Sequence, residues 1–205
     1  MSNTNNSRTI TSYNSHIQEY VDGTVSVVSG TVKEWIDRAF EDVSTNAQIL
    51  EFGSAFGRDA SYLQEQGYKV TCTDATPGFV KLLQEKGFDA RVLNAISDEL
   101  PRNLDVVLAN AVLLHFTRVE TTEVLRKVLD SLSEGGKFAF TLKQGEGEEW
   151  SEDKLGAPRF FTYWTAKQIQ HLLEEIGFAD ISVWGDRTGA RGVNWLQIIA
   201  KKSTK

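Results

Sequence analysis

Apolar residues recur along this 205-residue chain with two different spacings, and segments of the two kinds alternate. In residues 31–40, Val32, Trp35, Ile36 and Phe40 recur at helical spacing, which predicts an amphipathic helix with one buried face. Short apolar runs bounded by glycine or polar residues predict buried strands. We expect strands at 48–52, 68–74, 88–94, 104–110 and 137–142, with helices at 58–67, 77–87 and 118–136 between them.

This alternation of strands and helices predicts βαβ units, and therefore an α/β fold with a doubly wound, mostly parallel sheet. The ending differs, because strands 178–186 and 192–202 follow the helix 165–177 with only a short Gly- and Arg-containing turn between them. We therefore expect seven strands, finishing in a C-terminal antiparallel hairpin. No repeat or linker divides the chain, so residues 13–205 should form one domain. Residues 1–12, rich in Asn, Ser and Thr, should be a disordered leader.

Composition narrows the class of protein. Hydrophobic residues make up 40% of the chain and no apolar run reaches the ~20 residues that span a bilayer, so no membrane partner is expected. The polar N-terminus does not resemble a signal peptide, and the single cysteine suits a reducing compartment, so we expect a cytoplasmic protein. A net charge of −6 disfavours nucleic acid as a substrate, because gripping phosphates usually requires a basic face.

The turn after the first strand concentrates small residues, with Glu51, Gly53, Ala55 and Gly57 in the pattern acid-x-G-x-A-x-G. Such a turn either lets a helix pack closely on a strand or cradles a nucleotide-like ligand at the helix N-terminus. A dinucleotide fingerprint, G-x-G-x-x-G, would need glycine or alanine where Arg58 stands. A phosphate-binding G-x-x-x-x-G-K-[ST] loop is absent from the sequence.

The pattern resembles motif I of class I S-adenosylmethionine (SAM)-dependent methyltransferases, E/D-x-G-x-G-x-G, with Ala55 in place of the middle glycine. The resemblance implies a Rossmann-like sheet and a SAM pocket. It also assigns Asp74, at the end of the second strand and followed by Ala75, to the ribose hydroxyls of SAM. Asp74 precedes Thr76 and Pro77, however, and could instead cap the next helix.

Further motifs extend the resemblance from about Trp35 to Ala200. By position in the family, Asn94 and Ala95 would meet adenine, although Asn94 could also be an ordinary loop residue. Asn110, after the fourth strand, would approach the methionine part of SAM. The glycine pair before strand 137–142 resembles the family's usual helix–GG–fifth-strand signature. Segments 145–150, 159–178 and 195–202 are similar to small single-domain bacterial methyltransferases of the type 11 kind.

Candidates for chemistry are few. Methyl transfer needs a base only if the acceptor arrives protonated, and His115, just after the fourth strand, is the best-placed catalytic candidate. It could equally be a structural histidine. His16 and His171 are less promising, and Cys72 should be a buried strand residue. The scattered histidines and one cysteine give no metal-ligand spacing, so no metal is expected.

The most probable function by this resemblance is SAM-dependent methyl transfer to a nitrogen or oxygen of a small molecule, by a monomer or homodimer. The alternatives are an RNA- or protein-modifying methyltransferase and a non-catalytic SAM-fold module. Acceptor contacts should come from residues 13–24, whose tyrosines could fold over the cofactor, and from the acidic loop and aromatic cluster around 144–160. Acids and aromatics suit a cationic or amine-bearing acceptor, although this segment could also be a solvated loop beside core aromatics.

Overall fold

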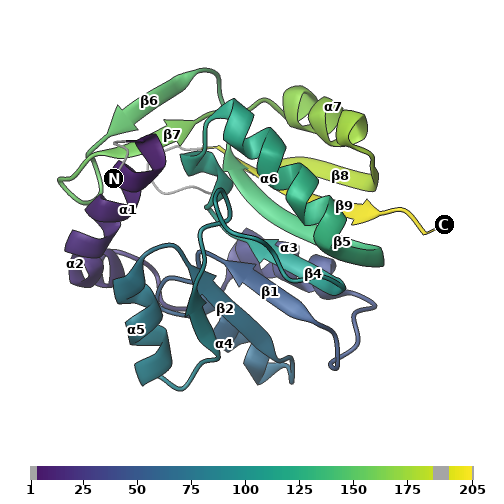
Figure 1. Cartoon of the computed structure of the whole chain (residues 1–205), viewed down its shortest axis with the longest axis horizontal. Helices are drawn as coiled ribbons and strands as arrows, with labels where there is room; N and C mark the ends of the chain where they lie inside the picture. Colours follow the sequence, from purple (N-terminus) through teal and green to yellow (C-terminus); the bar gives the residue numbers. More distant parts are fainter. Residues whose placement is uncertain (1–3, 187–193, 205) are drawn as a thin grey trace.

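A seven-stranded sheet forms the centre of the protein in the computed structural model, which describes residues 4–186 and 194–204 (Figure 1). The strand order is β3-β2-β1-β4-β5-β9-β8. Strands β1 to β5 pair in parallel, and β9 pairs antiparallel with both β5 and β8. The bounds are β1 Ile49–Phe52, β2 Val70–Asp74, β3 Ala90–Val92, β4 Leu104–Ala109, β5 Leu132–Lys143, β8 Phe178–Asp186 and β9 Trp195–Lys202. The expected fold class is confirmed.

Helices cover both faces of this sheet, and its central strands are therefore buried on both sides. Neighbouring residues of β4 alternate between two cores: Val106 and Leu108 belong to one, and Val107 and Ala109 to the other. Helices α3 (Gly30–Phe40), α4 (Arg58–Glu65) and α5 (Pro77–Glu85) contribute to the first core. Helices α6 (Arg118–Ser131) and α7 (Ala166–Ile176) contribute to the second, beside the 3-10 helix η1 (Leu113–His115).

The expectation of a disordered leader is wrong for the described part of residues 1–12. Residues Asn5–Ser15 form helix α1, followed by α2 (Ile17–Asp22). A capping box starts α1, in which Thr4 and Ser7 exchange side-chain to backbone hydrogen bonds. The hydroxyl of Ser12 donates to the carbonyl of Pro158 at 2.6 Å, and Thr9 Oγ1 accepts from the backbone N–H of Phe160 at 3.1 Å. Part of the polar composition thus reflects tertiary hydrogen bonds of the buried Thr9 and Ser12.

Two further boundaries differ from expectation. Helix α6 ends at Ser131, not at the glycine pair, and residues 132–136 already belong to β5. The segment around 144–160 is not an open loop, because it contains β6 (Glu148–Ser151) paired antiparallel with β7 (Arg159–Thr162). Figure 1 shows α1 beside this two-stranded ribbon. Residues 187–193, which hold the predicted hairpin turn and the first two residues of the predicted strand 192–202, lie outside the described residues.

Within residues 4–186 and 194–204, no helix is long and apolar enough to span a bilayer.

Candidate functional site

A pocket opens beyond the carboxyl ends of β1, β2, β3 and β4. This is the side of a doubly wound sheet where ligands bind. Strands β1, β2 and β3 follow one another toward one edge of the sheet, and β4 and β5 are added on the other side of β1, so the strand order reverses at the pocket. The empty space of the pocket is about 690 Å³ when the open solvent at its mouth is counted, and the centre of a water-sized sphere can reach about 90 Å³ of it. Eight of the predicted site residues line it: Gly53, Ala55, Asp74, Ala75, Asn94, Ala95, Asn110 and His115. Glu51 and Gly57 are not among the lining residues.

The small residues of the β1–α4 turn all have left-handed backbones, with φ of 61° at Gly53, 48° at Ala55 and 88° at Gly57. A Cβ on Gly53 would lie 2.5 Å from Cγ2 of Val112, and one on Gly57 would lie 2.8 Å from the ring of Phe88. Both glycines therefore permit close packing as well as an unusual backbone. Of these two glycines, Gly53 lines the pocket. Gly57 is the residue before α4 and is not part of the pocket lining.

Asp74 ties together two of the loops that form the pocket. Its Oδ2 accepts from the backbone N–H of Ala55 at 3.0 Å, and its Oδ1 accepts from that of Thr76 at 2.8 Å. The side chain is buried, and burial raises its pKa although both hydrogen bonds act in the opposite direction. Each oxygen retains capacity for another donor, so a local structural role and ligand binding are compatible here.

Asn94 and Ala95 follow β3 and form the next part of the wall. The Asn94 amide donates to Oδ1 of Asn6 on α1 at 2.7 Å, while its carbonyl oxygen accepts from the N–H of Ile96 at 3.1 Å. Helix α1 is therefore joined to the loop on which we expect adenine to lie.

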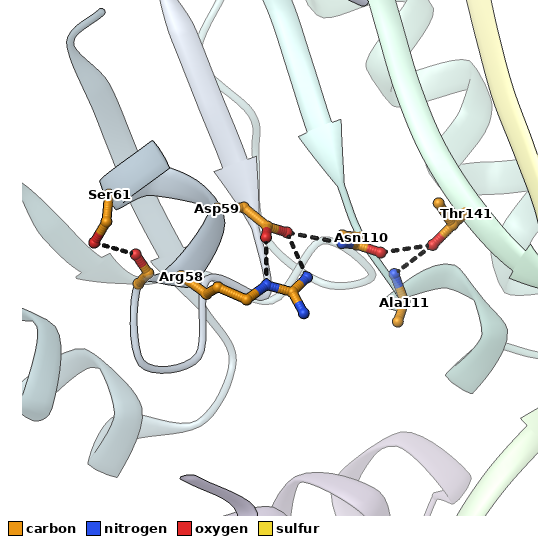
Figure 2. A network of polar contacts seen from close by, with 7 residues as sticks. Arg58, Asp59, Ser61, Asn110, Ala111 and Thr141 are labelled. Carbon is orange, nitrogen blue, oxygen red and sulfur yellow. Dashed lines mark hydrogen bonds and ion pairs between the residues drawn. The ribbon is translucent and has the colours of Figure 1, made fainter. Parts of the chain in front are cut away.

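A partly buried polar network connects the first turn of α4 to the ends of β4 and β5 (Figure 2). Asp59 forms a two-point ion pair with Arg58 and accepts from Nδ2 of Asn110 at 2.8 Å. The other end of the Asn110 amide accepts from Thr141 Oγ1 at 2.9 Å, and this hydroxyl accepts from the N–H of Ala111 at 2.8 Å. Asn110 thus lines the pocket with its amide held by protein partners on both sides.

Glu51 lies on β1 behind the glycine turn, almost completely buried. Burial and, to a lesser extent, the neighbouring Asp59 carboxylate raise its pKa to about 8. One carboxyl oxygen, Oε2, has no hydrogen-bond partner among the described residues. The motif acid therefore supports the turn from within the core and does not contact the pocket.

His115 ends η1 and contacts residues from both α1 and β7. Its Nδ1 lies 2.6 Å from the carbonyl oxygen of Phe160, which can only accept, so Nδ1 carries the proton. Its Nε2 lies 2.9 Å from the hydroxyl of Tyr13, which then donates to it. Burial lowers the pKa of His115 to about 3, and the charges of Arg159 and Lys143 lower it too. The imidazole is therefore neutral at physiological pH.

The remaining candidates from the sequence lie away from the pocket lining. His171 is exposed and within 3.4 Å of Glu175 on the surface of α7. The Nδ1 of His16 lies 2.9 Å from the carbonyl oxygen of Ser12 at the end of α1. Cys72 is fully buried on β2, as expected, and burial raises its pKa to about 12. No group of His, Cys, Asp or Glu side chains in the described residues is arranged to hold a metal.

Several contacts of the site were not predicted from the sequence. Tyr13 and Tyr20 both line the pocket, where their rings meet edge to face with centroids 5.4 Å apart. Tyrosines in residues 13–24 were expected there, but not the hydrogen bond from Tyr13 to His115. Asp59 resembled an ordinary charge in the first turn of α4. Its spacing of eight residues from Glu51 was the only sequence signal, and it was not informative alone.

Comparisons with known proteins agree with this geometry. A family model described as "Methyltransferase domain" matches residues 18–183. No curated protein matches the sequence significantly. Three solved structures share the fold: the 1,6-didemethyltoxoflavin-N1-methyltransferase of Burkholderia thailandensis, phosphoethanolamine N-methyltransferase 2 of Haemonchus contortus, and a SAM-dependent methyltransferase from Methanosarcina mazei.

The toxoflavin enzyme is 20% identical, with 95% of this chain and 85% of that chain covered and a TM-score of 0.71. The Haemonchus enzyme is 14% identical with a TM-score of 0.73; the match covers 93% of this chain but only 57% of that longer one. The Methanosarcina protein is 17% identical, with 87% and 99% covered and a TM-score of 0.68. At these identities the structures show a common fold, and the match over residues 18–183 shows the family. This chain belongs to the methyltransferase domain family.

Proposed function

We propose that the protein is a SAM-dependent methyltransferase that methylates a nitrogen or oxygen of a small molecule and releases S-adenosylhomocysteine. The observation that carries the proposal is the Asp74 carboxylate on the pocket wall, hydrogen-bonded to the turn that contains Gly53 and Ala55. Its two oxygens each have remaining acceptor capacity, which suits the two hydroxyls of a ribose.

The other pocket residues fit the same cofactor. Leu93 and Ala95 provide buried apolar contacts for a purine ring, beside the amide of Asn94. Asn110 and the left-handed Ala111 face the pocket after β4, where the methionine part would lie. When bound, SAM supplies a methyl carbon attached to a positively charged sulfur.

Much of the rate of such a transfer comes from alignment of the acceptor, which the closed arrangement of α1 over the pocket promotes. Burial lowers the pKa of His115 to about 3, so its imidazole is poorly suited to take a proton from the methyl acceptor. We assign His115 instead to the positioning of Tyr13, because its Nε2 accepts the hydrogen bond of the Tyr13 hydroxyl at the pocket wall.

Two of the structural neighbours support a small-molecule acceptor. The Burkholderia enzyme was crystallised with 1,6-didemethyltoxoflavin and S-adenosylhomocysteine, and the Haemonchus enzyme is named for phosphoethanolamine and was crystallised with SAM.

Titration calorimetry with SAM, S-adenosylhomocysteine and NAD tests the cofactor assignment. We expect saturable binding of both adenosyl compounds and much weaker binding of NAD, because Arg58 occupies the position of the third dinucleotide glycine. Tight NAD binding without a response to either adenosyl compound would refute the proposal.

A further inference from the structure

Arg159, the first residue of β7, carries a buried positive charge that forms no ion pair with an anionic group of the described residues. Its side chain is among the buried polar groups, at 6% exposure. The described residues provide one hydrogen-bond acceptor to it, the Tyr13 hydroxyl, 3.3 Å from Nη1. Nε is buried and has no acceptor among these residues. A guanidinium has five N–H donors and does not lose its charge in proteins, so this site is rich in unused donors.

A second cation lies beside it. Lys143, at the end of β5, places Nζ 3.7 Å from the ring centroid of Phe161, and the guanidinium carbon of Arg159 lies 5.0 Å from the same centroid. Burial lowers the pKa of Lys143, and the charge of Arg159 lowers it further. Across residues 4–186 and 194–204, neither cation forms an ion pair with a carboxylate.

The acidic residues nearby do not neutralise this pair. Glu149 and Asp153 act on Lys143 only through longer-range attraction, and Glu149 accepts a hydrogen bond from the hydroxyl of Tyr163. Contacts with aromatic faces offset part of the cost of burying a cation, but they leave its N–H donors unsatisfied. Buried charges in proteins are normally paired, so two cations packed on one aromatic ring without a carboxylate partner among the described residues indicate that an anion completes the site.

The location relates this cluster to the proposed chemistry. Arg159 donates to the same Tyr13 hydroxyl that donates to His115, and Phe160, the next residue, accepts from His115 Nδ1. Lys143 is only half-buried, so its side of the cluster is partly open to solvent. An anionic group held here would place the rest of a small molecule near the Tyr13–His115 pair.

We propose that Arg159 and Lys143 form a subsite for an anionic oxygen group, a carboxylate or a phosphate, on the methyl acceptor. The proposal rests on the proposed function, since it describes one end of that acceptor. The acids and aromatics around residues 144–160 predicted a cationic or amine-bearing acceptor, and the proposal adds an anionic group to that molecule. The acceptor would carry a negative group separate from its nucleophilic nitrogen or oxygen.

The test uses inorganic phosphate and acetate as probes in calorimetric titrations, with and without saturating S-adenosylhomocysteine. The variants are Arg159→Met, which keeps the length and removes the charge, and Lys143→Gln. Arg126→Gln, on the exposed surface of α6, is the matched control. We expect wild type to bind at least one of the probes saturably, and each variant of the subsite to weaken binding about tenfold or more, because charged hydrogen bonds are lost. The control should bind like wild type, and the stronger probe distinguishes phosphate from carboxylate.

Three results would overturn the subsite. These are no saturable binding of either anion to wild type, equal binding by wild type and both variants, or a parallel loss of S-adenosylhomocysteine affinity, which would assign the cations to the cofactor. If Arg159→Met does not fold, Lys143→Gln alone decides. If wild type fails to bind S-adenosylhomocysteine, the proposed function fails, and the titrations without it still decide whether the cations bind an anion.

Discussion

The hydroxyl of Tyr13 donates a hydrogen bond to Nε2 of His115 at 2.9 Å, joining residues 102 positions apart in the sequence. The bond links α1 to the segment after β4, at the edge of the candidate pocket. Because Nδ1 is held by the carbonyl of Phe160, the lone pair of Nε2 is directed at Tyr13. The role of His115 therefore has to be tested together with that of Tyr13.

His115→Asn should lower turnover by about tenfold while leaving SAM affinity nearly unchanged, because the Tyr13 hydroxyl loses the hydrogen-bond acceptor that orients it. Asparagine offers an amide N–H for the carbonyl of Phe160 but no acceptor at the position of Nε2. Steady-state kinetics and calorimetry measure the two quantities, with exposed His171→Asn as the control.

The pH dependence provides a second test of His115. Its folded pKa of about 3 lies below the ordinary value of 6.5, so the neutral imidazole persists on lowering the pH through 6.5. The wild-type profile of kcat/KM should therefore show no step near pH 6.5 from this residue. A step there that disappears in His115→Asn would contradict the buried, neutral state.

Asp74→Asn should weaken SAM binding by roughly 10- to 100-fold, the effect of losing a hydrogen bond to a charged group. The variant should also be less stable by about 1 kcal/mol, because one amide oxygen cannot replace both acceptors for Ala55 and Thr76. Calorimetry and urea unfolding check these values against Asp130→Asn, on the exposed face of α6. Lower stability with normal SAM affinity would show that Asp74 joins the two loops by hydrogen bonds and does not bind the cofactor.

Gly53→Ala should destabilise the protein by about 2–4 kcal/mol, since a left-handed alanine costs roughly 1–2 kcal/mol and overpacking against Val112 adds to it. Gly87→Ala is the control for the backbone term alone, because Gly87 has φ of 86° and nothing within 4 Å of an added Cβ. Adding Val112→Ala to Gly53→Ala should restore part of the loss in urea unfolding. Equal losses for Gly53→Ala and Gly87→Ala would show that the contact with Val112 is unimportant.

Glu51→Gln should change how stability depends on pH. The folded pKa of Glu51, about 8, exceeds its ordinary value of 4.5, so the unfolded chain releases this proton first as pH rises. Glu51 therefore makes wild type progressively less stable between about pH 4.5 and 8. Glutamine does not titrate, so the variant should gain stability relative to wild type across this window. Denaturant unfolding at several pH values measures the difference, and a constant difference would argue that Glu51 is ionised in the folded protein.

The sheet was predictable because its signals are local. Apolar runs such as 104–109 need burial on both faces, and glycines with left-handed backbones end the connecting segments. The strand-end positions of Asp74, Asn94 and Asn110 followed from the same pattern, which explains why these residues meet at one pocket.

The features that the sequence did not predict depend on contacts between distant segments of the chain. Thr9 and Ser12 are typical of a solvated leader until β7 and the residue before it supply their partners, and Asp59 is an ordinary surface charge until Asn110 lies beside it. Arg159 stands among aromatic residues in the sequence, which predicted core packing but not an unpaired cation. Nothing in local spacing encodes such pairings.

Helix α1 contributes Asn6, Thr9, Ile10 and Tyr13 to the pocket wall, yet the family match begins only at residue 18. The shared catalytic framework and this part of the wall are therefore separate stretches of chain. Chimeras joined at the α1–α2 boundary would therefore replace these four lining residues and keep the stretch that the family match covers, which tests whether the opening helix selects the methyl acceptor.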